Sequence, residues 1–104
     1  MTTVNLQFNI LIMIKNFKSN KLKKAFLKDD FSGILPEHIE KCRLILSAIN
    51  MATDIADLNR PSFNLHPLKG DKKGVWAITV RANWRITFKF ENGNAYILDY
   101  EDYH

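Results

Sequence analysis

The chain has 104 residues, of which 46% are hydrophobic and 12% aromatic, and its single cysteine, Cys42, excludes an internal disulfide framework and a cysteine-rich zinc site. This length suits one compact domain, and a lone cysteine fits a reducing compartment, so we expect a cytoplasmic protein. The formal net charge of +4 favours an anionic partner without identifying one.

An apolar run, FNILIMI, occupies residues 8–14, and a positively charged run follows it. The apolar run is too short to span a bilayer, and neither a positive segment before it nor a small-residue cleavage site after it supports a signal peptide. We therefore expect neither export nor membrane insertion. The charged run contains no acidic residue and consists of Lys15, Lys18, Lys21, Lys23, Lys24 and Lys28. We interpret it as a solvated face, and alternatively as a surface that contacts phosphate backbones.

Two helices are predicted in the first half of the chain. The first runs from Asn20, as its N-cap, through Lys28, because an asparagine side chain can accept a hydrogen bond from the first turn. Its apolar residues recur at helical spacing, as Leu22, Ala25 and Phe26. The second helix follows Pro36, whose fixed φ suits a first turn. Its core stripe is Cys42, Ile45, Leu46, Ile49 and Ala52, and Leu44, Ala48, Met51 and Ile55 are expected to widen that buried face.

From Ser62 onward the apolar residues alternate, which is typical of strands. Three alternating sets are expected to form strands: Phe63 and Leu65; Trp76, Ile78 and Val80; Trp84, Ile86, Phe88 and Phe90. We prefer a three-residue loop, residues 81–83, between the last two sets, because it pairs Val80 with Trp84 and keeps both sets on one face. A two-residue loop would place Arg81 opposite Trp84 and put the sets on opposite faces.

Asn92 and Gly93 form a favoured two-residue hairpin turn, which predicts a last strand paired with the one before it. Regular pairing from that turn places Phe88 opposite Ile97 in the core. On the other, polar face it pairs Lys89 with Tyr96, Thr87 with Leu98 and Arg85 with Tyr100, and an extended chain would add Asp102 and His104. These elements predict an α+β domain, with two N-terminal helices packed on a mainly antiparallel sheet.

The three histidines differ in their surroundings. His38 lies in the first turn of the second helix among acidic residues, and we expect it to be exposed and without function. His66 either satisfies a loop carbonyl or serves in proton transfer or phosphate contact, because histidine titrates near neutral pH. His104 ends the chain, where termini usually fray, but it follows a run of aromatic and acidic residues.

The predicted polar face has the groups that RNA cleavage without a metal ion requires. Such cleavage needs a group that deprotonates the 2′-hydroxyl, a cation near the charge that develops at phosphorus, and a proton donor for the 5′-oxygen. These types are supplied by His66, Lys69, Arg81, Arg85, Tyr103 and His104. Tyr96, Tyr100 and Tyr103 could stack on unpaired bases. A metal site is disfavoured, because lysines and arginines surround the acids and no ligand spacing is distinctive.

A simpler interpretation stays open for two of these cations. Arg81 and Arg85 could form surface ion pairs with Asp99 and Glu101, without any role in catalysis. The tryptophans are assigned to the core because both fall on the apolar face of the alternation. Cys42 lies on the buried helical stripe, so we do not expect a reactive thiol.

From Met13 onward, the segments MIKNFK, LHPLKGD, GVWAITVRANWRITFKF and NAYILDYEDYH resemble the HigB-type toxins, or plasmid maintenance killer proteins, of the RelE superfamily. The resemblance defines a toxin domain over residues 13–104 and an N-terminal extension over residues 1–12. The extension is either an upstream start choice, which we favour, or an added apolar strand. It implies a RelE-like, compact microbial-ribonuclease-type fold. It also implies a ribosome-dependent endoribonuclease that cleaves mRNA in the A site, inhibits translation and uses no metal or other cofactor.

The matching motifs carry the family's site residues onto this chain. The HPLKGD segment gives His66 and Lys69, VRANWR gives Arg81 and Arg85, and EDYH gives Asp102, Tyr103 and His104. We expect Arg85 and Lys69 to stabilise phosphate charge, and His66 and His104 to divide the proton transfers. Asp102 is expected to orient a neighbour, and Tyr103 to stack on an mRNA base. The further RNA contacts that we expect are Arg81, Lys72, Lys73, Lys89 and Tyr100.

The resemblance also implies the partners of the protein. These are a cognate helix-turn-helix antitoxin of the HigA type, the A site of the ribosomal 30S subunit with its rRNA, and mRNA. Operator DNA would be contacted only through the antitoxin, and no membrane is involved. The chief alternative is a non-catalytic ribosome- or RNA-binding inhibitor of translation, and a third interpretation is a protein that only co-represses DNA through the antitoxin.

Overall fold

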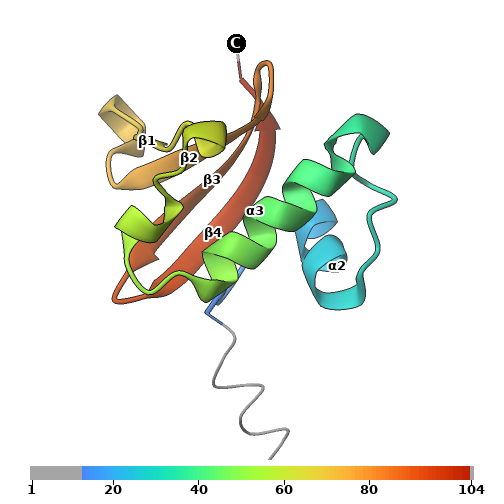
Figure 1. Cartoon of the computed structure of the whole chain (residues 1–104), viewed down its shortest axis with the longest axis horizontal. Coiled ribbons are helices and arrows are strands. Elements are labelled where there is room, and N and C mark those ends of the chain that lie inside the picture. The colour runs from blue at the N-terminus through green and yellow to red at the C-terminus, as the bar shows by residue number, and fades with distance from the viewer. Residues whose placement is uncertain (1–12, 104) are drawn as a thin grey trace, which may run out of the picture.

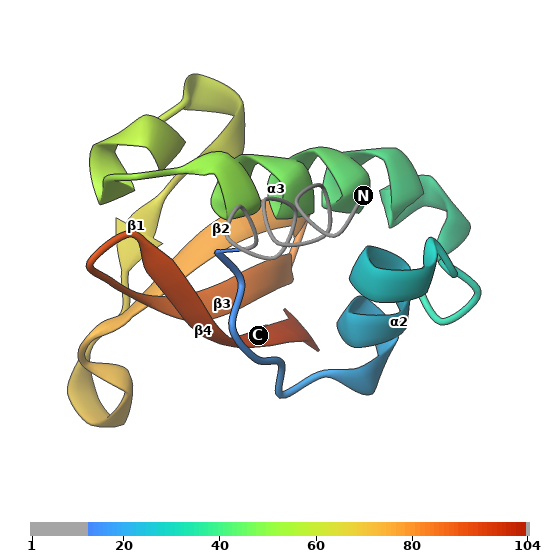
Figure 2. The ribbon, with the colours of Figure 1, turned by 90° about the horizontal axis from the view of Figure 1, so that it is seen from below.

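The structure, a computed structural model, describes residues 13–103, and residues 1–12 and His104 lie outside the described part. Two helices, α2 (Asn20–Lys28) and α3 (Ile39–Met51), lie against one face of a four-stranded antiparallel sheet (Figures 1 and 2). The strands, in sheet order, are β1 (His66–Pro67), β2 (Val75–Arg81), β3 (Trp84–Glu91) and β4 (Asn94–Asp102). The α+β architecture expected from the sequence is confirmed.

Helix α2 ends at Lys28 as predicted, but it already begins at Asn20, and its N-cap is Ser19 rather than Asn20. The Ser19 hydroxyl oxygen accepts a hydrogen bond from the amide of Leu22 at 3.2 Å, which satisfies one donor of the first turn. Leu22 and Ala25 are buried, whereas the lysines of the helix are exposed. The helix is therefore amphipathic as predicted, and its charged face remains in contact with solvent.

Helix α3 follows a 3₁₀ turn at Pro36–His38 and carries the predicted core stripe. The stripe residues are all buried: Cys42, Ile45, Leu46, Ile49 and, at the C-cap, Ala52. Leu44 and Met51, which were expected to widen that face, are 48% and 76% exposed. The prediction for these two residues is wrong because they point away from the sheet. Within residues 13–103 neither helix has the length and apolarity that crossing a membrane requires.

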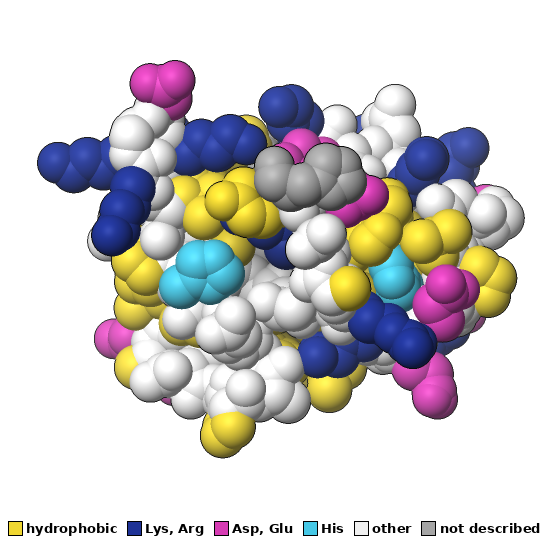
Figure 3. Space-filling view, turned by 90° about the horizontal axis from the view of Figure 1, so that it is seen from above, with side chains coloured by type: hydrophobic (Ala, Val, Ile, Leu, Met, Phe, Trp, Pro, Cys, Tyr) yellow, Lys and Arg dark blue, Asp and Glu magenta, His cyan; other side chains and the backbone are white. Residues whose placement is uncertain are grey.

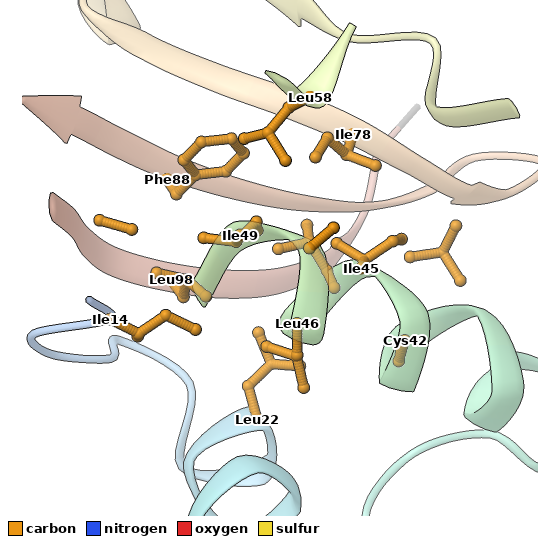
Figure 4. Packing of buried hydrophobic residues seen from close by; sticks show 14 of the residues in the cluster. Ile14, Leu22, Cys42, Ile45, Leu46, Ile49, Leu58, Ile78, Phe88 and Leu98 are labelled. Atoms are coloured by element: carbon orange, nitrogen blue, oxygen red, sulfur yellow. The ribbon is translucent and has the colours of Figure 1, made fainter. Parts of the chain in front are cut away.

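The hydrophobic core fills the space between α3 and the sheet (Figure 4). Ile45 and Ile49 extend from α3 toward the strands. The other labelled side chains of this hydrophobic cluster come from every part of the fold: Ile14, Leu22, Leu58, Ile78, Phe88 and Leu98. Burial of these large apolar side chains provides the main driving force for folding, and it commits one face of the sheet to the core.

The segment before β1 differs from the prediction. Phe63 and Leu65 are predicted to lie in a strand, but residues Pro61–Phe63 form a 3₁₀ turn. Proline fixes φ and lacks an N–H donor, and Asn64 follows with a left-handed φ of 48°, so the chain cannot run straight here. Strand β1 consequently begins only at His66 and contains two residues.

The turn between β2 and β3 has two residues, Ala82 and Asn83, because Arg81 lies opposite Trp84. The preferred three-residue loop is therefore wrong. A register shift between Thr79 and Arg81 inserts one extra residue into β2, which is a β-bulge. This extra residue keeps the apolar residues of β2 and β3 on the same face, although the turn is short.

The turn at Asn92 and Gly93 and the pairing of Lys89 with Tyr96 are confirmed. A second register shift then falls between Thr87 and Lys89, because β4 bulges near Ile97, whose φ is 49°. The bulge is held by the segment that precedes α2, since the side-chain oxygen of Asn16 accepts a hydrogen bond from the Ile97 amide at 2.6 Å.

The bulge changes which residues of β4 face the core. Leu98 is buried in place of Ile97, which is 40% exposed. From there on, each residue of β4 is displaced by one position from the predicted register. Arg85 therefore lies opposite Glu101 and not opposite Tyr100.

Candidate active site

A wide cleft lies on the side of the sheet away from the helices, beside the end of β4. Its volume is about 700 Å³, and it is lined by His66, Pro67, Leu68, Lys69, Lys72, Arg85, Glu101, Asp102 and Tyr103. On the end of the molecule that is uppermost in Figure 1, Lys and Arg side chains gather beside a histidine (Figure 3). The cleft combines cations, carboxylates and an imidazole on a surface that solvent reaches.

Arg85 lines this cleft from the start of β3, and it is only 8% exposed. Its Nε donates a hydrogen bond to Oε2 of Glu101 at 2.7 Å, and its Nη2 lies 2.6 Å from the same oxygen. The guanidinium also lies over the ring of Tyr103, 4.0 Å from the ring centroid. The planar cation is thus fixed by a carboxylate and by a cation–π contact.

Glu101 contacts a second cation of the cleft, since its Oε1 lies 3.6 Å from Nζ of Lys72. Partial burial tends to raise the pKa of this carboxyl, but the hydrogen bond from Arg85 and the charges of Arg85 and Lys72 outweigh burial and lower the pKa overall. Glu101 is therefore ionised near neutral pH. Lys72 reaches it because the loop after β1 turns tightly at Gly70, whose φ of 66° suits glycine.

His66 lies at the start of β1 and is held by its own backbone. Its Nδ1 lies 2.8 Å from the carbonyl oxygen of Asn64. A carbonyl oxygen only accepts hydrogen bonds, so Nδ1 carries the proton and donates it. In the neutral ring Nε2 then has the lone pair. The left-handed turn at Asn64 thus sets which nitrogen of His66 can accept a proton.

The C-terminal segment is tied to the turn between β2 and β3. The amide of Tyr103 donates a hydrogen bond to the carbonyl oxygen of Asn83 at 2.7 Å. The Tyr103 side chain stays 56% exposed while one face of its ring covers Arg85. A smaller cleft of about 270 Å³ continues the first one past His66, Arg85 and Tyr103, which line both. Its other lining residues are Asn64, Thr79, Ala82, Asn83 and Trp84.

Comparison with known proteins assigns the family. Residues 15–104 match the HigB-like toxins, described as the RelE-like toxin of the type II toxin-antitoxin system HigB. The chain belongs to this family. A relative from Proteus vulgaris, named Endoribonuclease HigB, is 56% identical over 92 residues, which are 88% of this chain and 100% of the relative. The resemblance that the sequence motifs carried is thereby confirmed.

In this HigB-like toxin most of the expected catalytic residues come together. His66, Lys69, Arg85, Asp102 and Tyr103 all line the main cleft, although the predicted strand register was wrong. His104 was expected to join them but lies outside the described residues. Of the further RNA contacts that were expected, Lys72 lines the cleft, whereas Arg81, Lys73, Lys89 and Tyr100 do not.

Tyr100 and His38 correct two predictions of the sequence analysis. His38 is 3% exposed and not a surface residue, and its Nδ1 lies 2.7 Å from the Tyr100 hydroxyl. Trp84 packs against both rings, with centroid distances of 5.5 Å to His38 and 4.6 Å to Tyr100. Burial raises the pKa of Tyr100. The bulge in β4 turns Tyr100 toward the helices, so it belongs to a partly buried aromatic cluster and not to the polar face.

Glu101 is the residue of the cleft that sequence reasoning left without a role in the site. One signal is present in the sequence, since Arg85 can pair with Asp99 or Glu101, but the pattern predicts only a surface ion pair without a role in catalysis. The structure pairs Arg85 with Glu101 and places Lys18 3.9 Å from Asp99. The ion pair of Arg85 is therefore real, and it lies inside the candidate site.

The described residues also bear on two other chemistries, metal binding and a reactive thiol. Within residues 13–103, no group of three or more His, Cys, Asp or Glu side chains is placed to hold a metal ion. Cys42 is buried, and burial raises the pKa of its thiol to about 12. A thiol with that pKa is protonated at neutral pH and is a poor nucleophile.

Proposed function

We propose that this toxin is an endoribonuclease that acts in the cytoplasm, cleaves mRNA in the ribosomal A site and so inhibits translation. The observation that carries the proposal is the cleft, which joins a histidine of fixed tautomer to a buried arginine and two lysines. The name of the Proteus vulgaris relative supports the same reaction. Membership of a type II toxin family supports a cognate antitoxin, for which we propose a helix-turn-helix protein of the HigA type.

The first chemical step that we propose is attack of a ribose 2′-oxygen on the adjacent phosphorus. His66 Nε2 takes the proton of the 2′-hydroxyl, because the hydrogen bond to Asn64 keeps the other ring nitrogen protonated. The new bond from the 2′-oxygen to phosphorus forms as the bond to the 5′-oxygen breaks. The products are a 2′,3′-cyclic phosphate and a new 5′-hydroxyl, so no water is consumed.

Negative charge grows on the phosphoryl oxygens during this step, and cations must already be in place to stabilise it. Arg85 is the best fixed cation of the cleft, since its exposed fraction is 8% and a carboxylate and an aromatic ring hold its plane. Lys69 and Lys72 also line the cleft. We propose that Arg85 and Lys69 bind the scissile phosphate and that Lys72 adds to the positive field.

The leaving 5′-oxygen needs a proton. For this transfer we propose His104, with Asp102 orienting a neighbouring group. Tyr103 presents one ring face to Arg85, and its side chain is 56% exposed, which leaves the other face for an unpaired base. The proposed role of Tyr103 is therefore to stack on the mRNA base next to the scissile bond.

The decisive experiment incubates the purified toxin with ribosomes that carry a defined mRNA in the A site. We expect mRNA cleavage within the A-site codon, with a 2′,3′-cyclic phosphate on the upstream fragment, and little cleavage of the same mRNA without ribosomes. Blocked translation with intact mRNA would instead support the non-catalytic binder. In cells, expression of the toxin alone should arrest growth, and co-expression of the antitoxin should restore it.

A further inference from the structure

The charge of Arg85 needs a partner inside the protein. The side chain is about one-tenth exposed, and a guanidinium removed from water is costly unless a carboxylate and hydrogen bonds compensate it. Glu101 supplies both. In doing so it places a negative charge in a cleft whose proposed ligand is an anion, which weakens the attraction for RNA. A residue that opposes binding in this way must contribute something else.

The geometry indicates what that contribution is. Both Nε and Nη2 of Arg85 approach a single oxygen, Oε2, and the second oxygen of Glu101 faces Lys72. Arginine has five N–H donors, so the edge of the group that carries Nη1 is not part of this contact. Tyr103 packs against one face of the guanidinium, and Glu101 binds one of its edges, so both the plane and the rotation of the group are fixed. Glu101 thus sets the direction in which the remaining donors of Arg85 point.

The backbone supports the same conclusion. Glu101 faces Arg85 only because β4 contains the bulge at Ile97. Isoleucine is β-branched and rarely adopts a positive φ, and its value here is 49°. Strained residues of this kind persist where the surrounding structure imposes them, and they cluster near functional sites. The strained residue, Ile97, thus lies in the bulge that determines which residue of β4 pairs with Arg85.

We propose that Glu101 is a positioning residue of the cleavage reaction, which orients Arg85 and restrains Lys72 so that both cations meet the scissile phosphate. This inference rests on the proposed function. Glu101 does not contact the RNA itself, and it acts on the transition state through the two cations. Its negative charge weakens the binding of RNA before the reaction. Its contacts with Arg85 and Lys72 hold these cations where negative charge develops on the phosphate in the transition state.

This role predicts opposite effects on binding and on turnover. Glu101→Gln removes the negative charge, so KM for ribosomes programmed with mRNA stays unchanged or falls. The same change loosens Arg85, so kcat falls by about tenfold to a hundredfold, as expected for a misplaced catalytic group. Glu101→Asp keeps the charge on a shorter side chain and should recover part of the lost kcat. If Glu101 only stabilised the fold, Glu101→Gln would reduce the amount of folded protein. It would not lower kcat while KM stays unchanged or falls.

The test measures kcat and KM for wild type, Glu101→Gln, Glu101→Asp and a control, Glu91→Gln. The control makes the same chemical change at an exposed position next to the Asn92–Gly93 turn, outside both clefts, and should match wild type. An unchanged kcat in Glu101→Gln would overturn the proposal. So would an equal loss of kcat in Glu101→Gln and Glu101→Asp together with a raised KM in both variants.

A second readout does not depend on catalysis. The NMR signal of the Arg85 Nε–H group in the free protein should be protected from exchange in wild type and Glu101→Asp and be lost in Glu101→Gln. If wild type does not cleave mRNA, the proposed function fails, and this signal still decides whether Glu101 fixes Arg85. Persistence of a protected signal in Glu101→Gln would show that the charge of Glu101 is not needed to fix Arg85, and the positioning role of the carboxylate would be wrong.

Discussion

The same short stretch of β3 and β4 builds two different histidine sites on its two faces. Trp84 and Tyr100 point toward the helices and enclose His38. Their chain neighbours, Arg85 and Glu101, point the other way and form the cleft that His66 lines. Successive residues of a strand alternate between faces, so two adjacent pairs of residues contribute to two unrelated environments.

The two sites differ in what surrounds the imidazole. The ring of His38 is 3% exposed, bonded to a phenol and packed against aromatic rings, so no substrate can reach it. His66 is partly exposed, with one nitrogen bonded to the backbone. A histidine that moves protons needs one restrained nitrogen and one that its substrate can approach. Of these two histidines, only His66 meets this condition.

The largest expected effect comes from His66→Ala. If Nε2 of His66 accepts the 2′-hydroxyl proton, its removal should reduce mRNA cleavage on ribosomes by about 10²–10⁴-fold. The thermal unfolding midpoint should change little, because the ring contributes only one hydrogen bond at the surface of the sheet. Single-turnover cleavage assays and circular dichroism melts measure the two quantities. A variant that cleaves at the wild-type rate would remove His66 from the mechanism.

Arg85→Gln should rank next, with a loss in cleavage of about 10²–10³-fold, as for removal of one donor to a developing anion. The chain offers a matched control in Arg43, which also pairs with a carboxylate, Asp29, at 2.5 Å and lies 4.4 Å from an aromatic centroid, that of Phe31. Arg43→Gln disrupts the same kind of arrangement on the helical layer, away from the clefts. Its cleavage rate should equal that of wild type, and equal losses in both variants would indicate a general effect of lost positive charge.

His38→Ala should change stability and not chemistry. It leaves a cavity beside Trp84 and removes one of the two hydrogen bonds of the Tyr100 hydroxyl, which keeps the one from the Leu35 amide, and we expect a loss of roughly 1–3 kcal/mol in the free energy of unfolding. Tyr100→Phe removes only the hydroxyl and should cost less, about 1 kcal/mol. Denaturant titration gives both values. Below the unfolding transition, the cleavage rate per folded molecule should match wild type, and a loss as large as that of His66→Ala would contradict the distinction between the two histidines.

Local patterns predicted much of the fold because they depend on nearby residues alone. Helical spacing located α2 and the stripe of α3, and the preference of Asn-Gly for tight hairpins located the turn at Asn92 and Gly93. The α3 prediction failed at Leu44 and Met51, where periodicity could not define the width of the buried face. That width depends on what the helix packs against, which is a tertiary property.

The two β-bulges account for most of what the sequence did not reveal. Alternation of apolar and polar residues predicts which side chains of a strand face the core, but it does not show where an extra residue is inserted. Val80 and Ile97, where the two bulges lie, are both apolar and fit the regular pattern. The bulge in β2 offsets the short turn after it, whereas the bulge in β4 displaces every later residue of that strand by one position from the predicted register. This displacement exchanged Tyr100 for Glu101 as the partner of Arg85. His66, Lys69 and Asp102 were named correctly as neighbours because the family motifs, and not the register, identified them.

The smallest expected effect concerns the pH dependence of stability. The pKa of Glu101 is lowered in the folded protein, so its ionised form stabilises the fold at neutral pH, and this contribution disappears as pH falls through the folded pKa. The unfolding free energies of wild type and Glu101→Gln should therefore converge between pH 7 and pH 3. The convergence should not exceed about 1 kcal/mol, because solvent reaches part of this carboxylate and screens its ion pairs. Glu91→Gln provides the reference for acid unfolding, and a difference that widened toward low pH would mean that the Glu101 carboxylate is not stabilised by Arg85 and Lys72.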